Sequence, residues 1–137
     1  MNDPLKGIGA AAQSGLRAQS ERLRVVAENM ANAETTALTP GGDPYRRKTV
    51  SFASMIDEAT GAQTVQVQEI SEDRSDFRLS YDPSHPAADE KGYVKRPNVQ
   101  PIIEMANMRE ASRSYEANLN MIETGRRMRG QLLDLLS

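Results

Sequence analysis

The chain lacks cysteine and tryptophan and has a single histidine among its 137 residues. Without cysteine it forms no disulfides, binds no metal through thiolates and has no cysteine nucleophile. Because His85 is the only histidine, sites that need several histidines are excluded, and any serine–histidine pairing depends on that one residue. These absences leave few of the common enzyme sites open.

Large apolar side chains are also scarce. Hydrophobic residues make up 38% of the chain, and its aromatic residues are two phenylalanines and four tyrosines. A single compact core spanning the chain would be thin, because large apolar side chains supply most of the free energy of burial. No run of about 18 apolar residues occurs, so no membrane-spanning helix is expected. The composition favours a protein that associates with others.

The formal net charge is only −2. Surfaces that bind nucleic acids are usually basic, because they must neutralise phosphates. We therefore expect no nucleic-acid partner. Residues 7–12 are too short and too weakly apolar for the core of a signal peptide, so any export from the cytoplasm is expected to proceed without a cleaved leader.

A first helix is expected over residues 4–33. Apolar or small residues recur there at alternating spacings of four and three, which is typical of the narrow seam of a coiled coil. The positions on this stripe that we expect to bind a partner are Leu5, Ala12, Leu16, Leu23, Val26 and Met30.

A second helix is expected over residues 101–137, because Pro101 suits a first helical turn and the same spacing follows it. Neither stripe can hold an isolated helix in water, so each must pack against the other helix or a neighbouring copy. The periodicity alone leaves these two possibilities open. The expected assembly positions are Met105, Met108, Tyr115, Leu119, Ile122, Leu133 and Leu136.

Residues 34–100 have no helical period. Turn-forming residues dominate the start of this segment, and alternating apolar residues further along predict a few short strands. The expected fold is therefore mainly α, with N- and C-terminal helices paired in a coiled-coil-like manner around a small, irregular, β-rich middle segment. Three parts are expected: residues 4–33, 34–100 and 101–137.

A few polar groups are candidates for sites of chemistry. His85 is expected to bridge a turn, and the acidic residues from 69 to 76 lack the spacing of a calcium loop. Basic residues at 46–48 fit phosphate contacts, whereas those at 126–129 are more simply explained by the dipole at a helix end. The sequence predicts no catalytic, cofactor-binding or metal-binding residues.

Residues 29–35, Asn-Met-Ala-Asn-Ala-Glu-Thr, resemble a signature of the bacterial flagellar rod and hook family. The resemblance continues through residues 45–48, 83–99 and 104–118, and residues 83–99 are similar to its proximal rod members. Residues 36–44 replace the short glycine–aromatic turn of hook and distal-rod relatives, which also favours the proximal rod. The residues that we take as the family motif are Asn29, Asn32, Thr35, Tyr45, Gly92, Tyr93, Pro97 and Asn98.

The resemblance implies a structural subunit of the flagellar proximal rod rather than an enzyme. Such a subunit polymerises through its terminal helices, transmits torque and lines the export channel. The implied partners are other rod proteins, copies of the chain, the export apparatus and the membrane ring region, with no cofactor and no small-molecule substrate. The implied location is the periplasmic rod of the basal body, reached without a cleaved signal peptide. The terminal helices would be loosely ordered before assembly.

Two other functions fit parts of the sequence. A soluble helical adaptor or export chaperone would use the same stripes to hold a client, and it would be stably helical by itself. An enzyme acting on peptidoglycan would need a pair of acids in a cleft, for which Glu69 and Glu72 are the candidates.

Overall fold

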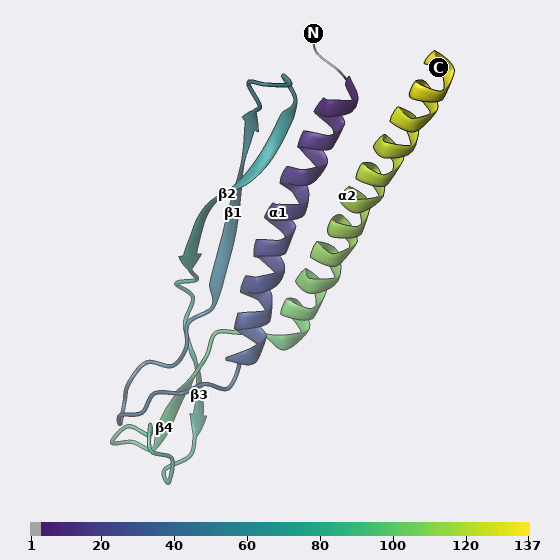
Figure 1. Ribbon diagram of the computed structural model, residues 1–137. Helices are drawn as coiled ribbons and strands as arrows, with labels where there is room; N and C mark the ends of the chain where they lie inside the picture. The colour runs from purple at the N-terminus through teal and green to yellow at the C-terminus, as the bar shows by residue number, and fades with distance from the viewer. Residues whose placement is uncertain (1–3) are drawn as a thin grey trace. The chain divides into compact units, whose positions relative to one another are not determined.

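The computed structural model describes residues 4–137 and contains two long helices and four strands (Figure 1). This confirms a mainly helical fold with a β-containing middle. No helix in the described part of the chain is long and apolar enough to cross a membrane. In chain order the elements are α1 (Pro4–Ala31), β1 (Lys48–Ile56), β2 (Gln63–Glu72), β3 (Arg78–Tyr81), β4 (Tyr93–Arg96) and α2 (Pro101–Leu136).

The chain divides into two compact units, each built from separate stretches of sequence. The described residues of the first unit are 4–23, 51–69 and 109–137, and those of the second unit are 24–50 and 70–108. Both helices therefore contribute residues to both units.

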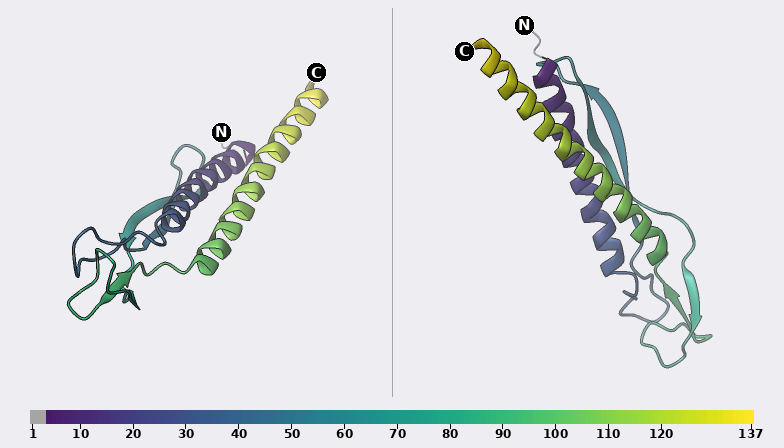
Figure 2. Two further views of the ribbon diagram at one scale, coloured as in Figure 1. Left: turned by 90° about the horizontal axis from the view of Figure 1, so that it is seen from below. Right: turned by 90° about the vertical axis from the view of Figure 1, so that its right-hand side faces the viewer.

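In the first unit, α1 lies between the β1–β2 hairpin and α2 (Figures 1 and 2). On the hairpin side, the backbone N–H of Val65 donates to Oγ of Ser14 at 3.1 Å, and the Ser14 side chain is buried. On the α2 side, a Cβ atom added to Gly15 would lie 2.6–2.7 Å from the side chain of Asn118. Small residues on α1 thus allow close approach from both sides.

The second unit contains the antiparallel pair β3–β4, in which Arg78 pairs with Arg96 and Tyr81 pairs with Tyr93. Gly92 precedes β4 with a φ of 88°, a backbone conformation that favours glycine. A Cβ atom there would also lie 2.9 Å from the ring of Tyr81. The core of this unit includes the buried side chains of Val25, Ala87, Val94, Pro97 and Val99.

Candidate functional site

Asn29 joins the end of α1 to the start of β1 in the second unit. Its Nδ2 donates to the carbonyl oxygen of Lys48 at 2.9 Å, and the N–H of Lys48 donates to its Oδ1 at 2.9 Å. The hydroxyl of Tyr45 donates to the same Oδ1 at 2.7 Å. With 1% of its surface exposed, Asn29 depends on these partners, because an unpaired buried amide is costly. Its side chain pairs with the strand backbone as a neighbouring peptide group would.

A buried ion pair lies beside Asn29. Glu104, in the first turn of α2, is 0% exposed, and Nε of Arg47 donates to its Oε1. Arg47 also donates through Nη1 to Oδ2 of Asp73 at 3.2 Å. A buried carboxylate needs such a partner, and a negative charge is further favoured in the first turn of a helix. The pair therefore fixes where α2 begins.

Burial and neighbouring groups shift the pKa values of Arg47, Asp73 and Tyr45. Burial lowers the pKa of Arg47, but its bonds with Glu104 and Asp73 outweigh that effect and raise the pKa overall. Hydrogen bonds from Ser75 lower the pKa of Asp73, and Arg47 adds to that effect. Burial, together with the charges of Glu28 and Glu104, raises the pKa of Tyr45 to about 12. Tyr45 therefore keeps its proton and stays neutral beside the charged side chains of Glu28 and Glu104.

Asn98 forms hydrogen bonds with the backbone of both Arg47 and Asp73. Its Oδ1 accepts the N–H of Arg47 at 2.7 Å, and its Nδ2 donates to the carbonyl oxygen of Asp73 at 3.0 Å. Arg46 donates to the same carbonyl at 3.0 Å while its guanidinium lies 4.1 Å from the ring centre of Phe77. We call Asn29, Tyr45, Arg47, Asp73, Asn98 and Glu104 the polar cluster.

The remaining family-motif residues lie nearby in the sequence but not all in the polar cluster. Asn32 donates through Nδ2 to the carbonyl oxygen of Glu28 at 2.9 Å, and Thr35 donates to Oδ1 of Asn32 at 3.1 Å. These bonds satisfy groups left open where α1 ends. Tyr93 packs edge-on against Tyr81 with ring centres 5.4 Å apart, next to Gly92. Pro97 is buried just after β4.

Sequence reasoning missed the roles of Arg47 and Glu104. The basic residues 46–48 fit phosphate contacts by sequence, but Arg47 is paired with Glu104 and Lys48 with Glu28 at 2.6 Å. Their partners are far away in the sequence, and no local pattern marks them. Glu104 is the fourth residue of α2, and the sequence alone does not distinguish a buried acid at that position from a solvent-exposed one.

The other candidates for chemistry are spread over turns and surfaces. Nδ1 of His85 accepts the N–H of Ala87 at 3.0 Å, so its ring bridges a turn. Glu69, Glu72 and Asp76 are exposed, whereas Asp73 belongs to the polar cluster. Among the described residues, no group of three or more acidic or histidine side chains is arranged to hold a metal ion.

The expected assembly positions differ in exposure between the two helices. On α1, Ala12 and Val26 are buried and the other four are partly covered. On α2, Met108 and Ile122 are partly covered, and the other five are exposed. The exposed five, with their exposed fractions, are Met105 (46%), Tyr115 (36%), Leu119 (40%), Leu133 (61%) and Leu136 (83%).

Known proteins resemble this chain along nearly its full length. Residues 90–135 match the family described as flagellar basal body rod FlgEFG protein C-terminal. The flagellar basal-body rod protein FlgC of Agrobacterium fabrum is 54% identical over 134 residues, which cover 98% of this chain and 96% of the relative. FlgC of Escherichia coli O6:H1 is 45% identical, with 90% and 92% covered, and FlgC of Bacillus subtilis is 39% identical, with 89% and 91% covered. The chain therefore belongs to the FlgC family of flagellar basal-body rod proteins, which are structural components of the basal body and not enzymes.

Proposed function

We propose that the chain polymerises in the proximal rod through the apolar residues of its terminal helices, transmits torque and helps to line the export channel. The observation that supports this most directly is the exposure of the apolar stripe on α2. Leu119 and Leu133 are 40% and 61% exposed, although leucine side chains favour burial by about 1.5–3 kcal/mol each. A neighbouring subunit would supply that burial.

The helices of each copy are proposed to pair in a coiled-coil-like manner. The close approach of Asn118 to Gly15 supports pairing within one chain. The exposed positions of α2 then remain for contacts between chains. Residues 4–33 and 101–137 would be the assembly helices, and residues 34–100 the middle segment.

The proposed location is the periplasmic part of the basal body, reached through the flagellar export apparatus without a cleaved signal peptide. The proposed partners are copies of the chain, other proximal and distal rod proteins, the export apparatus and the membrane ring region. Membership of the FlgC family supports this placement at the level of the basal-body rod. The same membership does not favour a soluble adaptor or an export chaperone.

Ordering of the helices is proposed to accompany assembly. The second unit has the polar cluster to hold residues 24–31 of α1 and 101–108 of α2. In the first unit, α2 has exposed apolar residues instead, and burial of these residues on assembly would offset the entropy lost on ordering the helices. We therefore expect coupled ordering mainly in residues 4–23 and 109–136.

The experiment that tests this function replaces one exposed apolar residue by an acid. Leu119→Asp is expected to abolish incorporation into basal bodies, because a carboxylate would be buried without a partner at the interface. Leu23→Asp on α1 is expected to do the same. Asn120→Asp, next to Leu119 on the exposed side of α2, adds the same charge and is the matched control. Normal motility with both leucines replaced would contradict the proposal.

A further inference from the structure

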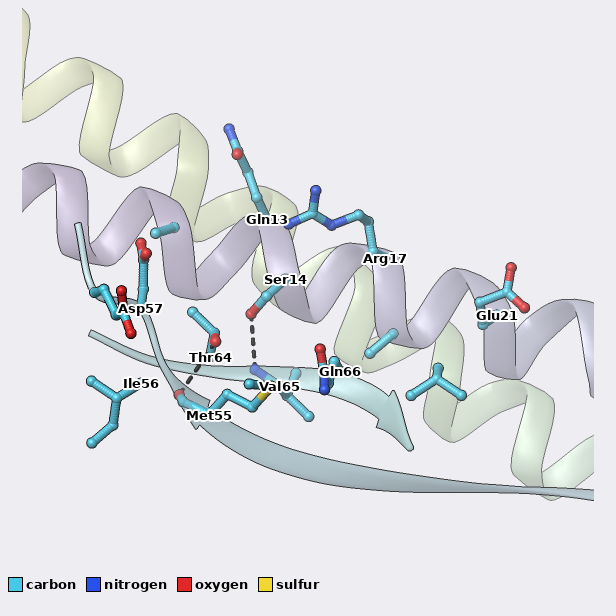
Figure 3. A pocket seen from close by; sticks show the side chains of 14 residues that line it. Gln13, Ser14, Arg17, Glu21, Met55, Ile56, Asp57, Thr64, Val65 and Gln66 are labelled. Carbon is cyan, nitrogen blue, oxygen red and sulfur yellow. Dashed lines mark hydrogen bonds between the residues drawn. The ribbon is translucent and has the colours of Figure 1, made fainter. Parts of the chain in front are cut away.

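An open groove lies in the first unit between α1 and the β1–β2 hairpin (Figure 3). One wall is a ridge of α1 side chains spaced four residues apart, Gln13, Arg17 and Glu21. The opposite wall comes from the hairpin, where Met55 and Ile56 are 47% and 69% exposed. The groove has a volume of about 850 Å³, which is room for several side chains.

The groove combines apolar surface with acidic charge. Its charged lining residues are three acids, Glu21, Asp57 and Glu58, and one base, Arg17. Exposed apolar side chains on its hairpin wall would gain from contact with another apolar surface. The groove therefore favours a partner that is both apolar and basic.

The last three turns of α2 have that character. Residues 126–136 carry three arginines and one acid, Asp134, and they are exposed along their whole length. Four leucines in this segment are more than half exposed: Leu132, Leu133, Leu135 and Leu136. We call residues 126–136 the distal α2 segment.

The hairpin that forms one wall of the groove and the distal α2 segment belong to the same unit but lie on opposite sides of α1 (Figure 1). Since α2 is one continuous helix to Leu136, its end cannot fold back over α1 to the groove of its own chain. Only another molecule can bring the two surfaces together.

We propose that the groove between α1 and the hairpin receives the distal α2 segment of a second copy of the chain. This inference rests on the proposed polymerisation and names the surfaces that meet. Because the two surfaces differ, the contact is head-to-tail, and such contacts extend into rings or open helical assemblies rather than closed pairs. Acidic groove residues face the arginines of the incoming helix, and the hairpin wall covers its leucines.

Cysteine crosslinking tests this contact, because the chain has no cysteine of its own. Gln66→Cys places a thiol in the groove and Leu133→Cys places one on the distal α2 segment. In basal bodies from flagellated cells that carry the variant as their only copy, the chain with both changes is expected to form a ladder of crosslinked oligomers on oxidation. Chains with either change alone are expected to form none. Gln13→Cys with Leu136→Cys repeats the test with a second pair.

A matched control uses a distant thiol. Ser84→Cys lies in an exposed turn of the second unit, and its combination with Leu133→Cys is expected to give no ladder. Dimers from chains with one cysteine would indicate contact between identical surfaces and would overturn the head-to-tail arrangement. A crosslinked product that contains a different protein would overturn the second copy as the occupant.

Charge reversal gives an independent test. Glu58→Lys and Arg127→Glu are each expected to lower the yield of the ladder about tenfold, and the chain with both changes is expected to recover it, because the two charges are exchanged. Glu90→Lys, an exposed acid of the second unit, is the control and should leave the yield unchanged.

The outcomes separate this inference from the proposed function. If variants enter basal bodies but neither cysteine pair gives a ladder, the groove contact is wrong and polymerisation through the terminal helices stands. If the unsubstituted chain is absent from basal bodies, the proposed function itself fails.

Discussion

Asn29 and Lys48 exchange two hydrogen bonds of 2.9 Å, although 18 residues lie between them. A side-chain amide on a helix thus takes the place of a strand neighbour for the first residue of β1. The same amide oxygen also accepts the hydroxyl of Tyr45. One residue therefore fixes the end of α1, the start of β1 and the path of the chain between them.

Asn29→Ala is expected to destabilise the second unit by about 2–4 kcal/mol, because it leaves the partly buried N–H and carbonyl of Lys48 without their partner. Urea unfolding followed by circular dichroism measures this loss. Asn32→Ala removes bonds with Glu28 and Thr35 at the partly exposed end of α1, where water can replace them, and a loss of about 1 kcal/mol is expected. Equal losses for the two variants would contradict the central role of Asn29.

Arg47→Met is expected to cost about 3–5 kcal/mol, because it leaves the buried carboxylate of Glu104 without its cation. The double variant Arg47→Met, Glu104→Gln removes both charges, and a smaller loss than the sum of the single changes is expected. A double-mutant cycle in urea checks this. Lys95→Met, which breaks an exposed pair with Asp43, should cost less than about 1 kcal/mol. If the loss of unfolding free energy in the double variant equalled the sum of the losses in the two single variants, Arg47 and Glu104 would not be coupled.

Stability is expected to fall at alkaline pH through Tyr45. Its pKa is raised from 10.0 to about 12, so the folded chain holds the phenolic proton more tightly than the unfolded chain. That contribution is complete below pH 10 and is lost as the pH rises from about 10 to about 12. Tyr45→Phe should flatten the unfolding free energy over this range.

The same slope in Tyr45→Phe and the parent would mean that another group titrates.

Gly15→Ala is expected to reduce incorporation about tenfold when it competes with the parent chain, because the new Cβ would force Asn118 away from its bond with the carbonyl of Ser114. A Cβ atom added to Gly9 would meet nothing within 4 Å among residues 4–137 outside its own stretch of helix, so Gly9→Ala should only favour the helix, by about 1 kcal/mol. The ratio of variant to parent in purified basal bodies measures both. Equal incorporation of the two variants would argue against close helix pairing at Gly15.

The sequence predicts the elements well where their periodicity is strong. The expected helix from residue 101 begins at Pro101, and the alternation of Leu79 and Tyr81 corresponds to β3. The first helix ends at Ala31, two residues before the expected end, because Asn32 turns its side chain back to the carbonyl of Glu28. Local patterns specify such features.

Contacts between distant residues could not be predicted in this way. Arg47 and Glu104 lie 57 residues apart, and neither has a neighbour that marks it as buried. The apolar stripe of α1 predicts one covered face, whereas Ser14 contacts the hairpin from another face. Both features depend on tertiary packing, which a single sequence does not encode in its local spacing.

Amide hydrogen exchange on the dilute, purified chain and on assembled basal bodies tests the coupling of helix ordering to assembly most directly. We expect rapid exchange over residues 109–136 in the dilute chain, protection around Asn29 and Glu104, and strong protection of residues 109–136 after assembly. Strong protection of residues 109–136 in the dilute chain would contradict this coupling, because the helix would then be ordered before any neighbour covers its apolar stripe.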